Sequence, residues 1–217
     1  MKQFCQDLKK GADTLGVKVS PDQVDLMAAH ARELQLWNAK MNLTAITDIR
    51  LMAYKHFVDA LAAAQFLEQP SRIMDIGSGA GFPAVPMKVI CPDFDVTMVD
   101  AVRKKVSFLN HVARTLKLDK INAVHARVED LAKDPGHFQG YDTVTARGFA
   151  DLGKLAALAG PMLAPGGRIY ALKGANALAE ITSEIEKRFQ ITHRSYTLPF
   201  ADAQRVVVIL KARRTHA

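Results

Sequence analysis

The chain has 217 residues, of which 49% are hydrophobic and 24% are charged, and its formal net charge is +7. This length suits one sizeable core, or one core with a small appendage, and the composition is that of an ordinary globular protein. No run approaches the roughly 20 apolar residues of a membrane helix, and Cys5 and Cys91 lack the spacing of a disulfide framework or a zinc site. We therefore predict no membrane span and no metal. Because the first residues are polar and unlike a signal peptide, we expect a cytoplasmic protein.

The positive charge is unevenly distributed along the chain. Residues 1–70 carry 8 Lys and Arg against 8 Asp and Glu, whereas residues 71–217 carry 21 against 14. An excess of positive charge favours the binding of polyanions, but it does not determine fold or chemistry. On charge alone, a nucleic-acid partner and a solvated basic surface explain the excess equally well.

Residues 1–70 are predicted to be helical. Ser20, followed by a proline, fits a helix N-cap, and apolar residues then recur at helical spacing. A segment rich in Asn and Thr interrupts this pattern before Asp48, which can cap a second helix that runs to about Leu67. Two or three helices are too few to fold alone. We therefore predict a helical extension over residues 1–70 that packs on a larger domain over residues 71–217.

From Arg72 onward, β-rich runs alternate with helical segments. The predicted strands cover residues 72–77, 94–100, 121–126, 141–146, 166–173, 191–198 and 205–212. The predicted helices between them cover residues 84–91, 103–118, 128–133, 152–163 and 176–188. This alternation predicts a parallel sheet with helices on both faces. The last two strands are predicted to form a hairpin, which gives a doubly wound, Rossmann-like α/β fold whose seven-stranded, mostly parallel sheet has one antiparallel strand.

A glycine-rich segment, DIGSGAGFP, follows the first predicted strand. A dinucleotide site would have the pattern GxGxxG. Counted from Gly77, the last glycine of that pattern would fall at position 82, where this chain has Phe82. The Gly-Lys-Ser/Thr of a P-loop is also missing. Asp75 followed by Gly77, Gly79 and Gly81 instead gives the D-x-G-x-G-x-G pattern of methyltransferases that use S-adenosylmethionine. This cofactor has no phosphate, and its methionine end needs a close approach to the backbone that side chains would block.

Two acids strengthen the cofactor prediction. Asp75 is placed to meet the cationic α-amino group of S-adenosylmethionine, directly or through water. Asp100 ends the second predicted strand about 20 residues beyond the glycines, where an acid binds ribose hydroxyls in nucleotide sites. The alternative is a tight strand-to-helix turn without a ligand, and the order of glycine loop, helix and acid-ended strand makes it the weaker interpretation.

Seven segments between Trp37 and Gly174 resemble one known family: WNAKMNLTAITD, KHFVDAL, MDIGSGAGFPAVPMKVICPD, VTMVDAVRKKVSFLNHVARTLKL, ARVEDL, YDTVTARGFADL and GGRIYALKG. In them the sequence resembles the GidB or RsmG family, bacterial methyltransferases that modify N7 of a guanine in the decoding-region loop of 16S ribosomal RNA. The resemblance implies a class I methyltransferase with S-adenosylmethionine as cofactor and the small ribosomal subunit as partner. We expect a monomer.

The resemblance also implies roles for individual residues. Cofactor contacts are implied at Gly77, Phe82, Asp100, Val128, Glu129 and Arg147. Where the family usually has SRAFA, this chain has ARGFA over residues 146–150. The arginine of that motif is therefore present as Arg147, but its serine is replaced by Ala146. Any hydrogen bond made by that serine is therefore missing.

The target atom indicates which chemistry the site needs. Guanine N7 has a lone pair in the ring plane, so it accepts a methyl group without first losing a proton, and alignment replaces a general base. Arg147 is predicted to orient guanine O6, a phosphate or the cofactor carboxylate; a salt bridge to Asp142 or Asp151 is the alternative. Asn42 and Thr44 are predicted either to close over the pocket and contact guanine or to cap helices.

Basic residues supply the predicted RNA contacts, which fall on Arg103, Lys104, Lys105, Arg127 and Lys173. His56 and Asp59 lie one helical turn apart, but a single histidine on a helix that builds the core is expected to be structural. Two other functions stay open: methylation of a small molecule or protein, and a non-catalytic RNA-binding assembly factor that keeps S-adenosylmethionine as a structural ligand.

Overall fold

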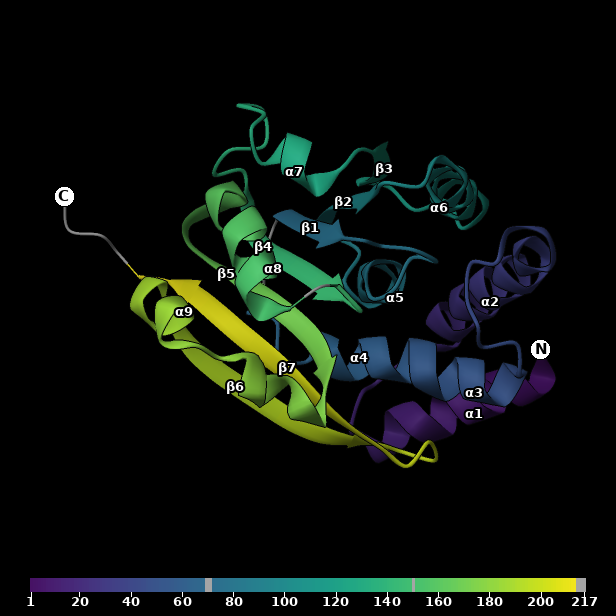
Figure 1. Ribbon diagram of the computed structural model, residues 1–217. Coiled ribbons are helices and arrows are strands. Elements are labelled where there is room, and N and C mark those ends of the chain that lie inside the picture. Colours follow the sequence, from purple (N-terminus) through teal and green to yellow (C-terminus); the bar gives the residue numbers. More distant parts are fainter. Residues whose placement is uncertain (69–71, 150, 214–217) are drawn as a thin grey trace.

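Seven strands form one sheet in the order β3-β2-β1-β4-β5-β7-β6 in the computed structural model, which describes residues 1–68, 72–149 and 151–213 (Figure 1). The strands are β1 (Arg72–Ile76), β2 (Asp95–Asp100), β3 (Ile121–His125), β4 (Tyr141–Arg147), β5 (Leu163–Gly174), β6 (Phe189–Leu198) and β7 (Ala203–Ala212). β7 pairs antiparallel with both β5 and β6, and the other neighbouring pairs are parallel. The predicted mostly parallel sheet with one antiparallel strand is confirmed.

The α-helices are α1 (Lys2–Thr14), α2 (Pro21–Met41), α3 (Ile49–Met52), α4 (Asp59–Ala64), α5 (Ala84–Ile90), α6 (Arg103–Thr115), α7 (Val128–Leu131), α8 (Leu152–Ala159) and α9 (Ser183–Arg188). A π-helical turn, η1 (Ala53–Val58), joins α3 to α4, and two 3₁₀ turns are η2 (Gly160–Met162) and η3 (Ala175–Glu180). The single helix predicted over residues 176–188 is therefore wrong. It is split because Ile181 and Thr182 are extended, and the Thr182 side chain caps α9 by accepting from the backbone N of Ile185.

The predicted helix starts agree with the capping found in the structure. Ser20 and Gln23 form a reciprocal capping box: the Ser20 hydroxyl accepts from the Gln23 backbone N, and the Gln23 side chain accepts from the Ser20 backbone N. The Asp48 side chain accepts from the backbone N atoms of Arg50 and Leu51 at the start of α3.

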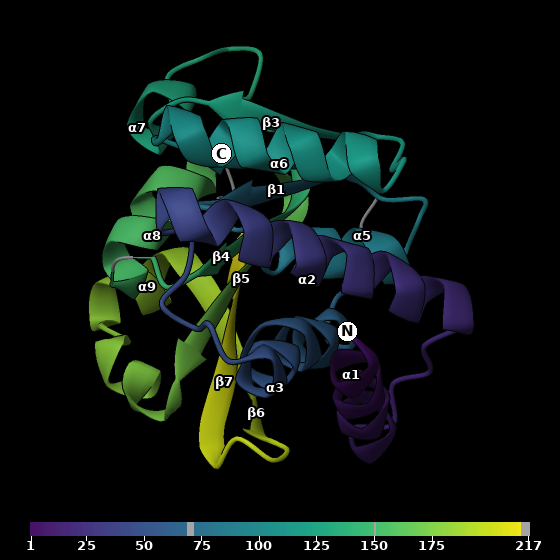
Figure 2. The same ribbon diagram turned by 90° about the vertical axis from the view of Figure 1, so that its right-hand side faces the viewer.

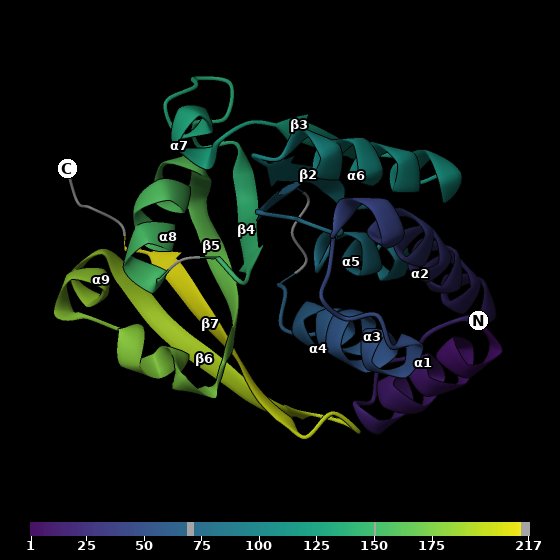
Figure 3. The same cartoon turned by 45° about the vertical axis from the view of Figure 1, so that its right-hand side comes forward.

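Helices cover both faces of the sheet. Neighbouring residues of β1 point to opposite faces, so Ile73 joins the hydrophobic cluster shared with α2, α5 and α6, whereas Met74 joins the cluster shared with α8 and α9. Figures 1 and 3 show α8 and α9 on one side of the sheet and α2, α5 and α6 on the other. Figure 2 shows α2 lying alongside α6. This doubly wound arrangement places the ligand crevice at the carboxyl ends of the parallel strands.

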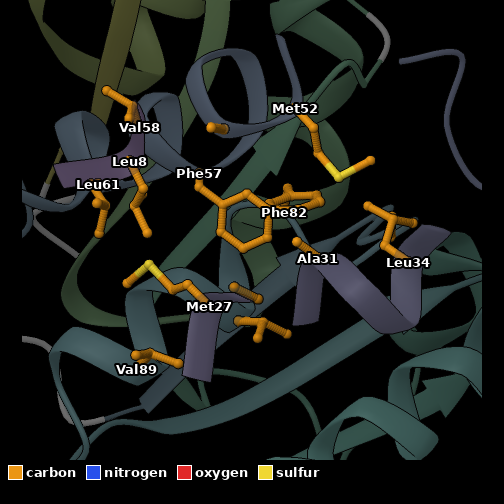
Figure 4. Close-up of a cluster of buried hydrophobic side chains, with 14 of the residues drawn as sticks. Leu8, Met27, Ala31, Leu34, Met52, Phe57, Val58, Leu61, Phe82 and Val89 are labelled. Carbon is orange, nitrogen blue, oxygen red and sulfur yellow. The ribbon is translucent and has the colours of Figure 1, made fainter. Parts of the chain in front are cut away.

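The first four helices share a hydrophobic core with the sheet. Figure 4 shows Leu8, Met27 and Phe57, from α1, α2 and η1, packed around Phe82 and Val89 from the glycine loop and α5. This continuous burial means that the glycine loop rests on the N-terminal helices. The division into an extension over residues 1–70 and a domain over residues 71–217 stays a prediction.

Across the described ranges, none of the helices combines the length and apolar character needed to cross a membrane.

Candidate functional site

Two cavities lie at the carboxyl ends of the parallel strands. The smaller cavity, of about 280 Å³, is lined by Ile76, Gly77, Val99, Asp100, Ala101, Ala126, Arg127, Val128, Glu129, Phe149 and Lys154. The larger cavity, of about 650 Å³, is lined by Ile46, Lys55, His56, Asp59, Arg147, Gly148, Phe149, Leu172, Lys173, Gly174, Ala175, Asn176, Ala177, Glu180 and Arg205. Phe149 lines both cavities, so they are neighbours that share one wall.

The glycine loop forms one side of the smaller cavity. Gly77, Gly79 and Gly81 all have positive φ angles, of 69°, 56° and 88°. A Cβ atom on Gly81 would lie 2.8 Å from a methyl group of Val85, so this glycine lets the loop pack closely on α5. Gly77 lies in the cavity lining and presents only backbone there, as the sequence predicts for a methionine-end contact, whereas Gly79 and Gly81 line neither cavity.

Asp75 lies beneath the glycine loop and is fully buried. Its Oδ1 accepts a hydrogen bond of 2.7 Å from the Thr145 hydroxyl, while Oδ2 has no partner among the residues that the structure describes. Burial raises the pKa of Asp75 to about 6. A buried carboxylate with an unsatisfied oxygen suits a cationic partner, but Asp75 lines neither cavity, so its contact with the α-amino group of S-adenosylmethionine stays a prediction.

Asp100 joins the end of β2 to the glycine loop. Its Oδ2 accepts from the backbone N of Gly79 at 3.0 Å, and its Oδ1 accepts from the backbone N of Val102 at 2.9 Å. Lys105 Nζ lies 3.8 Å from Oδ2. Asp100 therefore holds the loop in place and lines the smaller cavity, where its carboxylate is available to a ribose.

Val128 and Glu129 line the smaller cavity from the first turn of α7. The Glu129 carboxylate lies 3.6 Å from Lys154 Nζ, and hydrogen bonding within its own backbone, with the nearby charge of Lys154, lowers its pKa. Gly77, Asp100, Val128 and Glu129, four of the residues predicted to bind the cofactor, thus come together around one cavity. Arg127, predicted to bind RNA, lines the same cavity and is exposed.

Arg147 ends β4 and forms the centre of the larger cavity's polar wall. Its Nη1 lies 3.4 Å from Asp59 Oδ2 and donates to the carbonyl oxygen of Lys55, and its Nη2 lies 3.1 Å from Nδ1 of His56. The alternative salt bridges to Asp142 or Asp151 are wrong, since Arg147 forms its ion pair with Asp59 among the described residues. Burial lowers the pKa of Arg147, and Asp59 opposes that effect.

His56 links Arg147 to the NLT segment, which runs from Asn42 to Thr44. Its Nε2 lies 2.8 Å from the Thr44 hydroxyl, and because a guanidinium only donates, Nδ1 must be the accepting nitrogen. Burial, helped by the charge of Arg147, lowers the pKa of His56 to about 3, so the ring is neutral. The Asn38 side chain bonds both backbone groups of Thr44 and fixes the segment.

Phe82 lies between two histidine rings rather than in either cavity. The Phe82 ring stacks on His30 and on His56, with ring centroids 4.9 Å and 4.7 Å apart. The Arg147 guanidinium lies 5.1 Å from the centroid of the Phe82 ring. Phe82 is buried, so it couples the glycine loop to the larger cavity. Its predicted cofactor contact stays a prediction.

Asp59 connects Arg147 to the closing hairpin. Its Oδ1 accepts from the Tyr196 hydroxyl at 2.8 Å and lies 3.4 Å from Arg205 Nε. Although only 3% exposed, this carboxylate is therefore held between two arginines. The sequence predicts structural roles for His56 and Asp59 and gives no prediction for Arg205. The three-residue spacing of His56 and Asp59, which places them on one face of a helix, is the sequence feature that could have indicated a shared site.

The larger cavity carries four cations, Lys55, Arg147, Lys173 and Arg205, against the carboxylates of Asp59 and Glu180. Lys173 Nζ lies 2.6 Å from Glu180 Oε2. Sequence reasoning also missed Glu180 and Phe149, because nothing local in the sequence marks them.

The remaining predicted residues lie around the cavities. Asn42 ends α2 in a left-handed conformation, is exposed and, like Thr44, lines neither cavity. Arg103 and Lys104 are exposed at the start of α6, which follows the acid-ended strand β2. No group of three or more His, Cys, Asp or Glu side chains in the described part of the chain is placed to hold a metal ion.

Solved structures similar to this chain share its fold. A SAM-dependent methyltransferase from Aquifex aeolicus matches with a TM-score of 0.56 at 14% identity, covering 89% of this chain and 99% of that one. A SAM-dependent O-methyltransferase from Thermotoga maritima matches with a TM-score of 0.56 at 13% identity, covering 73% of this chain and 66% of that one. These likenesses confirm the Rossmann-like methyltransferase fold.

Sequence comparison gives nearer relatives. A protein of Geobacter sp. (strain M21) named ribosomal RNA small subunit methyltransferase G is 41% identical over 208 residues, which are 93% of this chain and 95% of that protein. Relatives of the same name from Streptococcus sanguinis and Roseiflexus castenholzii are 39% and 36% identical, covering 92% and 97% of this chain and 88% and 93% of theirs. The family model described as GidB, rRNA small subunit methyltransferase G, matches residues 23–208. The chain therefore belongs to the GidB family.

Proposed function

We propose that this protein transfers a methyl group from S-adenosylmethionine to N7 of a guanine in the decoding-region loop of 16S rRNA, within the small ribosomal subunit. The observation that carries the proposal is the pairing of two neighbouring cavities with different linings. One is lined by Gly77 of the glycine loop and by the acids Asp100 and Glu129, and the other has three further cations around the half-buried Arg147. Relatives named rRNA small subunit methyltransferase G support rRNA as the acceptor.

The smaller cavity would hold the cofactor. We assign the α-amino group to the region of Asp75, the methionine end to the backbone of Gly77, Gly79 and Gly81, the ribose to Asp100, and the adenine to Val128 and Glu129. Each assignment agrees with the chemistry of the donor set: a buried carboxylate for a cation, bare backbone for a close approach, and a carboxylate for hydroxyls. When bound, S-adenosylmethionine supplies a sulfonium methyl group.

The larger cavity would hold the guanine. Since N7 attacks through a lone pair that carries no proton, the residues here need only orient the base and exclude water. His56 is neutral and serves to hold Arg147, so it is not assigned as a general base. Arg147 touches the substrate in this proposal, whereas Thr44 and Asn42 act by positioning. Thr44 acts through His56, and Asn42 acts by ending α2 as the first residue of the NLT segment.

The surrounding cations would bind RNA phosphates. Arg127 lines the smaller cavity, and Arg103, Lys104 and Lys105 begin α6 beside Asp100. Lys173 lines the larger cavity and would meet the RNA at the target nucleotide itself. We further propose that the protein acts as a cytoplasmic monomer, with residues 1–70 as a helical extension of the methyltransferase domain.

The test is to map N7-methylguanosine in 16S rRNA from cells with and without this protein, and to repeat the reaction with purified components. Labelled S-adenosylmethionine is offered with undermethylated small subunits, with free 16S rRNA and with a pool of small metabolites. Label at one guanine N7 of the subunit is the expected result. Label in metabolites would support another methyltransferase reaction, and no label with retained cofactor binding would support a non-catalytic assembly factor.

A further inference from the structure

Glu180 and Lys173 form an ion pair on the wall of the larger cavity. Glu180 Oε2 lies 2.6 Å from Lys173 Nζ and also accepts a hydrogen bond of 2.8 Å from the backbone N of Leu152. Both contacts use the same oxygen, so Oε1 is the carboxylate oxygen available to a ligand. The Glu180 side chain is 33% exposed, which agrees with its place in the cavity lining.

The atom that is methylated does not by itself select guanine, because adenine also has an N7. The two bases differ at positions 6 and 1 of the ring. Guanine presents an acceptor, O6, beside a donor, N1–H, whereas adenine presents an amino donor beside an acceptor, N1. A site that selects guanine therefore needs a donor and an acceptor side by side, in that order.

We propose that Glu180 is a specificity-determining residue: its Oε1 accepts from N1–H of the target guanine while Lys173 donates to O6. This inference rests on the proposed function, because it takes the larger cavity as the site of the acceptor base. The ammonium and carboxylate already lie together, so the pair is preorganised and needs no rearrangement to present its donor and acceptor. Adenine would place donor against donor and acceptor against acceptor.

The carboxylate also suits the charge that develops during the reaction. Methylation at N7 makes the guanine ring cationic, and its N1–H becomes a stronger hydrogen-bond donor. A carboxylate fixed at N1–H is therefore more favourable in the transition state than in the ground state, and it offsets the charge of the nearby Lys173 ammonium. Glu180 is predicted to affect the rate of methyl transfer more than the binding of the subunit.

The test uses Glu180→Gln, because this variant separates reading of the base from a structural role. The glutamine carbonyl still accepts from the backbone N of Leu152 and from Lys173, so both internal contacts remain. Its amide NH₂ group then takes the place of Oε1 and faces the N1–H of guanine, donor against donor. We expect a single-turnover rate on saturating undermethylated small subunits that is about 10- to 100-fold lower, the range for loss of one hydrogen-bonded base contact.

Three further measurements accompany the rate: S-adenosylmethionine affinity by calorimetry, the thermal midpoint, and the same assays on Glu180→Ala and Glu184→Gln. Glu184 is an exposed carboxylate in α9, outside the larger cavity, and Glu184→Gln should behave as the wild type. Unchanged cofactor affinity and thermal midpoint in Glu180→Gln, with the lower rate, support the inference.

Three results would overturn it. Wild-type rates for Glu180→Gln, with loss confined to Glu180→Ala, would show that Glu180 only caps α8 and pairs with Lys173. A fall in cofactor affinity that matches the fall in rate would place Glu180 on the cofactor side. Absence of N7-methylguanosine with the wild-type protein would refute the proposed function itself. This measurement on the wild type does not depend on any Glu180 variant.

Discussion

Nη2 of Arg147 lies 3.1 Å from Nδ1 of His56, and this contact fixes the protonation of the ring. Because Arg147 only donates, the His56 proton is on Nε2, where it is donated to the Thr44 hydroxyl. The chain Thr44–His56–Arg147 therefore transmits the position of the NLT segment to the arginine of the larger cavity.

Arg147→Lys should greatly reduce methyl transfer while changing subunit binding little. A lysine keeps the charge but cannot reach His56, Asp59 and the Lys55 carbonyl together, as the guanidinium does. We expect the single-turnover rate to fall at least about 100-fold, which corresponds to roughly 2.7 kcal/mol of lost transition-state stabilisation.

Arg168→Lys is the matched control for that change. Arg168 is also a half-buried arginine in an ion pair, with Glu68 at 2.6 Å, but it lines neither of the two site cavities. Its variant should keep the wild-type rate. Full activity in Arg147→Lys would show that charge alone suffices and that the fork geometry is not used.

His30 should make the protein less stable in acid. Its Nε2 donates to the Ala80 carbonyl, the ring is fully buried against Phe82, and burial lowers its pKa to about 4 from 6.5. Below pH 6.5 the unfolded chain therefore gains a proton that the folded protein does not. Each pH unit down to about 4 then costs up to about 1.4 kcal/mol of the free energy of unfolding.

Urea unfolding of the wild type and His30→Gln at pH 7.5 and pH 4.5 measures this effect. The variant should be less stable at pH 7.5, because it loses ring packing. The difference in free energy of unfolding between the wild type and the variant should be smaller by about 2 kcal/mol at pH 4.5. Asp75 acts in the opposite direction, since its raised pKa makes the folded state bind a proton as pH falls through 6, but it is present in both proteins. An equal gap at both pH values would contradict the prediction.

Asp75→Asn should stabilise the protein and weaken its cofactor. Since burial raises the pKa of Asp75 from 3.8 to about 6, ionisation at pH 7.5 costs about 3 kcal/mol, which a neutral amide avoids. The amide oxygen can still accept from the Thr145 hydroxyl. We expect a free energy of unfolding that is equal or higher at pH 7.5, with S-adenosylmethionine affinity lower by about tenfold or more. The stability difference should shrink to about 1 kcal/mol near pH 4.5, where Asp75 is protonated in the folded protein but still mostly ionised in the unfolded chain, and it should vanish only below the unfolded-state pKa of 3.8. Unchanged cofactor affinity would refute the assignment of Asp75 to the cofactor.

Local patterns in the sequence were enough to predict the sheet and the glycine loop that follows β1. The alternation of β-rich and helical runs is a property of neighbouring residues, and the glycine spacing after β1 is short and distinctive. The split between η3 and α9 escaped prediction because Thr182 caps a new helix inside an apparently continuous helical run.

The polar wall of the larger cavity could not be predicted in this way. Arg147 and Asp59 are separated by 88 residues, and their contact depends on how η1 and α4 pack against β4. A sequence shows that an arginine follows a strand, but its partner is decided by tertiary packing. For the same reason, Asp142 and Asp151 were the nearer candidates and both were wrong.

Gly79→Asp should abolish cofactor binding without unfolding the protein. Gly79 has a φ of 56°, and a Cβ atom there would meet only the Gly77 carbonyl oxygen, at 3.8 Å, so the fold tolerates a side chain. Gly16→Asp is the matched control: its φ is 71°, no atom lies within 4 Å of the added Cβ, and it follows α1 far from the loop. Both variants should lose about 1 kcal/mol of stability from the left-handed backbone. Only Gly79→Asp should lose S-adenosylmethionine binding in calorimetry, and retained binding would refute the placement of the cofactor.

The two ends of α6 should differ in their effect on the salt dependence of subunit binding. Arg103 and Lys104 begin the helix after the acid-ended carboxyl end of β2, whereas Lys117 and Lys120 follow its last turn and precede the amino end of β3. Each phosphate contact with single-stranded RNA contributes about 0.7 to the slope of log K against log salt. Replacing Arg103 and Lys104 by Gln should therefore lower the slope by roughly 1.4, and replacing Lys117 and Lys120 should leave it unchanged.

Filter binding of small subunits between 50 and 200 mM salt, on the order of the range in which such contacts weaken, measures both slopes. Equal slopes for the two double variants would mean that the start of α6 does not contact RNA phosphates, because both double variants remove the same charge and differ only in its position.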